Sequence, residues 1–82
     1  MKANDKIITL IHLQPDEKAI IIGINGGRMV NQRLNDLGLT IGTELAIKGG
    51  APFGGPIQIL IRGSILVIGR GIAAKILVKR QS

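Results

Sequence analysis

The chain has 82 residues and carries six more basic than acidic side chains at neutral pH. Hydrophobic residues make up 45% of it and aromatic residues only 1%, so one modest core of aliphatic side chains is expected, rich in the β-branched residues that suit sheets. The absence of cysteine excludes disulfides, zinc–thiolate sites and thiol catalysis.

The excess positive charge is confined to the second half of the chain. Residues 1–44 carry five basic and five acidic side chains, whereas residues 45–82 carry six basic side chains and no acidic one. An unbalanced basic surface favours nucleic acid, anionic lipid or an acidic protein as a partner. These cations are widely spaced along the sequence, so a merely solubilising surface is the plainer interpretation.

No segment has the pattern of a signal peptide or a membrane span. The N-terminal stretch MKANDKIITLIHLQ contains an acidic residue and lacks both a long apolar run and a small-residue cleavage site. The longest apolar runs, such as residues 19–22 and 65–68, are far shorter than the roughly 20 residues that a membrane helix needs. We therefore expect a protein of the reducing cytoplasm that does not cross a membrane.

The first part of the chain predicts a short lead-in, a turn and a strand. Leu10 and Leu13 belong to the lead-in, and the sequence PDEK at residues 15–18 is typical of a turn. Residues 19–24 predict the first buried strand, which ends at the Asn-Gly-Gly sequence of residues 25–27.

After this turn the apolar period becomes helical. Val30, Leu34 and Leu37 are spaced i, i+4 and i+7, which places them on one face of a helix of about two and a half turns. Gly38 follows where a left-handed C-cap is required. We expect Leu34 to be buried and Arg33 to be exposed beside it.

The second half returns to the period of two that is typical of strands. Gly63-Ser64 has the order expected for a type II′ hairpin turn. The sequence GRGIAAK at residues 69–75 predicts a short turn or a single helical turn. Four further strands are expected, at residues 44–48, 57–61, 65–68 and 76–79.

About five short strands with one short α-helix inserted after the first predict a mostly β protein, a small SH3-like β-barrel. Such a barrel exposes few sheet edges, which suits a chain too short to cover a large open sheet. We expect a single domain over residues 1–82, with its core at about residues 10–78.

The chain contains the segment RLNDLGLTIGTELAI, followed by GGAPFGGPIQILIRGSILVIGRGIAAKILV. In this order the two segments resemble the FeoA family, and the resemblance runs from about Leu10 to Val78. It implies an SH3-like fold and a small cytoplasmic component of bacterial ferrous iron uptake. A related module forms the C-terminal domain of iron-dependent repressors of the DtxR type. The family usually has Pro-Gly in the turn before the first strand, whereas Pro15 is followed here by Asp16, which leaves the type of that turn open.

The residues predict neither an enzyme nor a metal or cofactor site. The single histidine, His12, and five scattered acids form no catalytic constellation, and the adjacent pair Asp16-Glu17 lies in a predicted surface turn. Ferrous iron prefers several imidazole and carboxylate ligands, so His12 is interpreted as a packing or surface residue. The sequence GINGG at residues 23–27 lacks the lysine of a phosphate-binding loop and is interpreted as a turn.

Nucleic-acid binding is the second interpretation. Small β-barrels that bind nucleic acid usually stack bases on aromatic rings, and Phe53 is the only aromatic residue in this chain. The basic residues do not cluster, so no nucleic-acid partner is expected. A nucleic-acid-binding or regulatory module related to the repressors' C-terminal domain remains the alternative.

The preferred candidate site is a docking loop at residues 51–56. Its glycines widen and its prolines restrict the backbone conformations available, so that the loop is expected to present Phe53. An interpretation in which the ring caps the core stays open. The expected partner-binding residues are Ala51, Pro52, Phe53, Gly54, Gly55 and Pro56 in the loop, with Lys48, Arg62 and Arg33.

The resemblance implies that the partner is the cytoplasmic GTPase region of the large membrane transporter FeoB, which would recruit the protein to the inner face of the membrane. Homo-oligomerisation and peripheral membrane contact stay open. The outer face of the predicted helix, around Arg28, Gln32 and Asn35, is the next candidate for docking.

Overall fold

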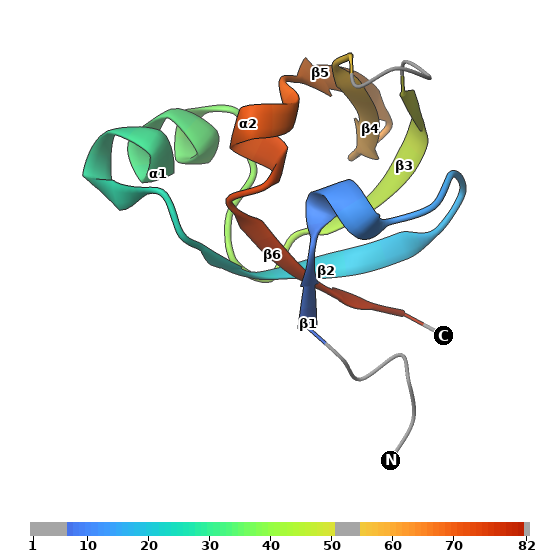
Figure 1. The fold of residues 1–82 in the computed structure, drawn as a ribbon, viewed down its shortest axis with the longest axis horizontal. Helices are drawn as coiled ribbons and strands as arrows, with labels where there is room; N and C mark the ends of the chain where they lie inside the picture. The colour runs from blue at the N-terminus through green and yellow to red at the C-terminus, as the bar shows by residue number, and fades with distance from the viewer. Residues whose placement is uncertain (1–6, 51–54, 82) are drawn as a thin grey trace.

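The computed structural model describes residues 7–50 and 55–81. These residues form six strands, two α-helices and a short 3-10 helix (Figure 1). In chain order they are β1 (Ile7–Thr9), the 3-10 helix Leu10–His12, β2 (Lys18–Ile24), α1 (Gly27–Asp36), β3 (Glu44–Gly50), β4 (Ile57–Ile61), β5 (Ser64–Ile68), α2 (Arg70–Ala73) and β6 (Ile76–Arg80).

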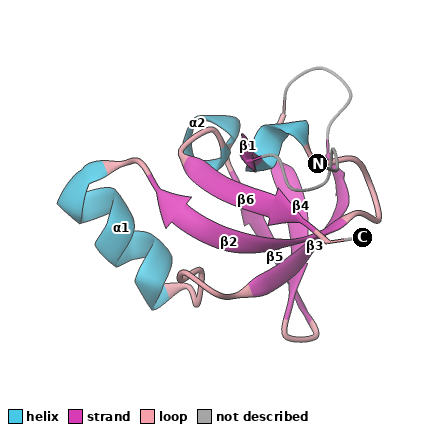
Figure 2. Cartoon of the chain, turned by 90° about the horizontal axis from the view of Figure 1, so that it is seen from below, coloured by secondary structure: helices cyan, strands magenta, loops and turns pink. Residues whose placement is uncertain are grey.

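All six strands belong to one antiparallel sheet in the order β1-β6-β2-β3-β4-β5. The sheet is strongly curled, and α1 lies at one end of it, beside the end of β2 (Figures 1 and 2). The predicted fold class, a mostly β, SH3-like domain with one inserted helix, is confirmed. Within the described residues β1 and β5 do not pair with each other, so the curled sheet is not closed into a complete barrel.

The structure contains one strand more than the sequence pattern predicted. Strand β1 pairs with β6, with Ile8 opposite Val78, where only a lead-in was expected. A strand of three residues is too short to show an alternating pattern. The single helical turn expected within residues 69–75 is present as α2.

The core consists of aliphatic side chains on the inner face of the sheet and under the helices. Residues at alternate positions of β3 and β4 are buried, which confirms the predicted period of two. The buried apolar residues are Leu10, Leu13, Ala19, Ile21, Leu34, Leu39, Leu45, Ile47, Ile57, Ile59, Ile61, Ile68, Ala73, Ile76 and Val78.

Helix α1 ends in a Schellman motif. Gly38 has a φ of +87°, which confirms it as the left-handed C-cap glycine. The Gly38 N–H donates to the Asn35 carbonyl at 3.0 Å, and the Leu39 N–H donates to the Leu34 carbonyl at 2.8 Å. Leu34 and Leu39 are both buried in the core, so the motif fixes the end of the helix to the sheet.

The hairpin between β4 and β5 differs from the predicted one. Its two loop residues are Arg62 and Gly63, with φ values of +52° and +81°, and Ile61 pairs with Ser64. The prediction of a type II′ turn at Gly63-Ser64 is therefore wrong, because positive φ at both loop residues is the type I′ geometry. A turn at Gly63-Ser64 would place Ile57 opposite Arg70, where α2 already begins.

The turn before β2 keeps the geometry that Pro-Gly would give. The Glu17 N–H donates to the Gln14 carbonyl at 3.0 Å, and Asp16 has a φ of +69°. Pro15 followed by a residue with positive φ is the pattern of a type II turn. Aspartate therefore occupies a left-handed position that glycine would occupy without steric cost.

Replacement of Asp16 by glycine should stabilise the protein. Relief of the left-handed strain, about 1 to 2 kcal/mol, exceeds the entropic cost of glycine, about 0.5 to 1 kcal/mol. Urea unfolding of Asp16→Gly should show a free energy of unfolding about 0.5 to 1 kcal/mol above the parent. Asp16→Asn removes the charge but tolerates the same conformation, so it should be neutral; an equal gain in both variants would assign the effect to charge.

Replacement of Leu34 by alanine should strongly destabilise the protein. Leu34 is 1% exposed, so its truncation leaves a cavity that should lower the free energy of unfolding by about 2 to 5 kcal/mol. The neighbouring Arg33 is exposed, and Arg33→Ala should leave the urea unfolding midpoint nearly unchanged. Equal losses in the two variants would contradict this assignment of the helix faces.

Candidate functional site

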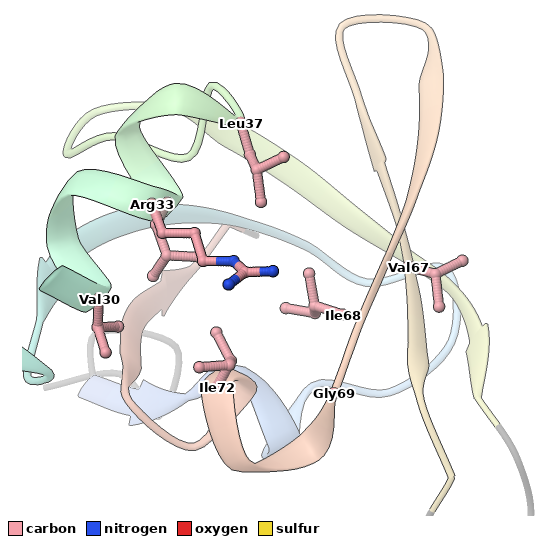
Figure 3. A pocket seen from close by; sticks show the side chains of 8 residues that line it. Val30, Arg33, Leu37, Val67, Ile68, Gly69 and Ile72 are labelled. Carbon is pink, nitrogen blue, oxygen red and sulfur yellow. The ribbon is translucent and has the colours of Figure 1, made fainter.

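An open groove of about 360 Å³ lies between α1, the end of β5 and α2 (Figure 3). Its lining is mostly apolar, and its one charged lining side chain among the described residues is Arg33, which extends across the groove towards Ile68. The lining residues are Val30, Arg33, Leu34, Leu37, Val67, Ile68, Gly69 and Ile72.

The groove follows from the way α1 is attached to the sheet. The loop after the helix is fixed by hydrogen bonds to β2, from the Gly42 N–H to the Ile21 carbonyl at 2.7 Å and from the Ile21 N–H to the Thr43 carbonyl at 3.0 Å. Val30 and Leu37 lie on the helix face that also carries Leu34, as the spacing predicted. The helix therefore forms one wall of the groove.

Two of the apolar residues that line the groove are exposed to solvent. Leu37 follows the last residue of α1 and is 43% exposed, and Val67 on β5 is 56% exposed. Sequence reasoning did not identify this groove. The available signals were a leucine beyond the helix end and apolar residues on both faces of β5, where a solvated strand would carry polar ones.

The predicted docking loop is only partly described. Ala51, Pro52, Phe53 and Gly54 lie outside the described residues. Gly55 is half-buried, Pro56 is exposed, and both directly precede β4.

The structure does not bring all the predicted site residues together. Lys48 is exposed on β3, two residues before that strand ends, and thus lies on the loop side. Arg62 follows the other end of β4, so a strand that spans about 17 Å separates it from Pro56. Arg33 lines the groove at α1 instead of joining Lys48 or Arg62.

The outer face of α1 borders a second, shallower depression. Arg28, Gln32 and Asn35 line it together with Ile41, which is 70% exposed. The helix thus separates two surfaces, one lined mostly by apolar residues together with Arg33 and one lined by more polar than apolar residues.

The side chains of His12 and Glu17 are engaged in hydrogen bonds with neighbouring groups. The Nδ1 atom of His12 lies 3.0 Å from the Thr9 hydroxyl oxygen. The Arg80 Nε donates to the Glu17 carboxylate at 2.9 Å, and the Gln14 N–H donates to the same carboxylate. Within residues 7–50 and 55–81, no three His, Asp or Glu side chains gather as a metal site would require. No helix in this part of the chain is long and apolar enough to span a membrane.

A family model described as FeoA domain matches residues 8–80. The chain belongs to the FeoA family. A relative from Methanocaldococcus jannaschii bears the name Fe(2+) transport protein A. It is 38% identical over 63 residues, which cover 77% of this chain and 74% of the relative. The NMR structure of a FeoA-like protein from Clostridium acetobutylicum superimposes with a TM-score of 0.84 at 35% identity, over 94% of this chain and 90% of that one. The predicted resemblance is thus confirmed.

The FeoA fold also occurs within a larger regulator. The manganese-activated repressor ScaR matches with a TM-score of 0.81 at 19% identity, over 90% of this chain and 35% of the repressor. At this identity the likeness concerns the fold alone, and it agrees with the expected relation to repressor domains.

The purified FeoA domain should not hold ferrous iron tightly. Micromolar affinity corresponds to about 8 kcal/mol, which is more than one imidazole and separated carboxylates should supply. Anaerobic calorimetric titration with Fe²⁺ should show no stoichiometric site of micromolar or tighter affinity. Such a site, lost in His12→Ala, would overturn this prediction.

Proposed function

We propose that this FeoA protein is a cytoplasmic accessory of ferrous iron uptake that acts by protein contact and not as an enzyme. Its partner would be the cytoplasmic GTPase region of the FeoB-type membrane transporter, which would recruit it to the inner face of the membrane. Family membership and a relative named for Fe(2+) transport support the pathway. The partner is an inference from the family resemblance.

The observation that carries the docking proposal is the groove between α1, β5 and α2. A concave, mostly apolar surface with the exposed Leu37 and a single guanidinium has the composition of a protein-binding site. Arginine is also one of the residue types enriched among the few contacts that dominate interface energies, so Arg33 is the expected anchor in the groove.

The charge distribution fits an acidic partner surface. Every acidic residue lies before residue 45, so every charged side chain after Glu44 is basic: Lys48, Arg62, Arg70, Lys75, Lys79 and Arg80. Long-range attraction of this kind speeds encounter more than it strengthens the final complex.

The loop of residues 51–56 stays a second predicted contact. Phe53 is the one aromatic side chain that the chain offers as an anchor. Lys48, which lies towards this loop on β3, would assist encounter. The nucleic-acid alternative has only fold likeness in its favour and is not proposed.

Loss of Leu37 should weaken binding to the transporter's purified GTPase region. Leu37→Ser removes about half of a leucine contact, or about 1 kcal/mol, so the dissociation constant should rise about fivefold in a calorimetric titration. Met29→Ser is the matched control, because Met29 is 85% exposed on the same helix but does not line the groove. Equal effects of the two changes would place the interface elsewhere.

The same calorimetric titration tests whether the loop of residues 51–56 contributes to binding in addition to the groove. Phe53→Ala should weaken binding by about thirtyfold if the ring is a buried anchor, while the variant unfolds cooperatively. Unfolding of Phe53→Ala would instead favour the core-cap interpretation. A parent protein that does not bind the GTPase region at all, with or without nucleotide, would refute the proposed function.

A further inference from the structure

Strand β5 is a sheet edge with two residues whose backbone groups point away from the sheet. A two-residue hairpin loop is closed by a pair that exchanges both backbone hydrogen bonds, here Ile61 and Ser64. Pairs then alternate along the ladder, so Leu66 and Ile68 bond to β4, while Ile65 and Val67 direct their N–H and C=O groups outwards. No further strand pairs with β5 within the described residues.

The outward groups of Val67 border the groove, and those of Ile65 lie further along the same edge towards the hairpin. Three consecutive residues, Val67, Ile68 and Gly69, line it, although side chains of successive strand residues point to opposite faces. Figure 3 shows the Ile68 side chain directed into the groove and the Val67 side chain directed away from it. Val67 therefore lines the groove through its backbone, and the free edge of β5 forms the wall opposite α1.

The β5 edge lacks the features that usually prevent strand addition. Its sequence, SILVI, contains no charge and no proline, and its register with β4 is regular throughout. The other edge strand, β1, is only three residues long. An apolar edge of five residues beside a groove is expected to be covered in the working protein.

The charges around this edge indicate what covers it. Arg33 extends over the groove, Arg70 begins α2 and Arg62 occupies the hairpin tip, while β4, β5 and β6 carry no acid. A second copy of the chain paired through β5 would bring these arginines close to the same arginines of the other copy. A segment with carboxylates would instead neutralise Arg33, whose planar guanidinium pairs well with them.

We infer that an extended segment of the partner protein adds to the free edge of β5 as a further strand, with apolar side chains alternating with carboxylates. Its backbone would bond to Ile65 and Val67, its apolar side chains would pack over Ile68 and Ile72, and a carboxylate would pair with Arg33. This inference rests on the proposed function and deepens it, because it specifies how docking occurs.

A displayed library of random decapeptides tests the chemistry of the segment with the intact protein. Enriched peptides should alternate apolar and acidic residues, and a synthetic enriched peptide should slow hydrogen exchange of the Ile65 and Val67 amides in NMR spectra. Val67→Pro removes an outward N–H without a ladder bond and should weaken peptide binding about tenfold. Arg33→Gln should weaken it about two- to fivefold, whereas Arg28→Gln on the outer face of α1 should not.

Several results would overturn the strand-addition model. They are enrichment of helical or basic peptides, absence of enrichment, protection of these amides by dimerisation of the protein alone, or full binding by a folded Val67→Pro variant. If Val67→Pro failed to fold, the parent protein would provide the test, because a bound peptide that left the exchange of the Ile65 and Val67 amides unchanged would contradict strand addition. If peptides bind as expected but the transporter's GTPase region does not, the docking function fails while the strand-addition site stands.

Discussion

The attachment of α1 to the sheet through Leu34 and Leu39 is the contact on which the rest of the site depends. Both side chains are buried, and the hydrogen bond between their backbones closes the helix at Gly38. Without aromatic side chains in the described core, tight aliphatic packing must hold the helix in place. This anchoring fixes one wall of the groove at a constant distance from β5 and leaves Leu37 at its rim.

The proposed docking function depends on a strand edge that stays unpaired within the described residues. A closed barrel would satisfy every strand edge, but within the described residues β5 has no further strand beside it, and its outward groups at Val67 border an apolar groove crossed by Arg33. Backbone hydrogen bonds would supply affinity, the groove would select side chains, and the basic second half would speed encounter with an acidic partner. The proposed action by protein contact would place this FeoA protein as an accessory in ferrous iron transport, with which its family is associated.

Periodic features could be predicted from the sequence, and features set by distant contacts could not. The alternation in β3 and β4, the helix spacing and the cap at Gly38 are local patterns, and all are present. The hairpin turn was misplaced by one residue, because Gly63 suits either turn and only the start of α2 selects the register. Arg62 was grouped with the loop because it is near in sequence, yet the length of β4 separates them. The groove unites residues from three elements, and the apolar residues on both faces of β5 do not by themselves indicate which elements lie opposite.

The most direct test of this account is NMR mapping of the ¹⁵N-labelled protein during titration with the transporter's cytoplasmic GTPase region. The account predicts that the largest amide shifts or line broadening occur at Ile65 to Gly69 and at Leu37, with little change at Met29. Perturbation confined to β1 and β2, or to the outer face of α1 around Gln32, would contradict docking at the β5 groove.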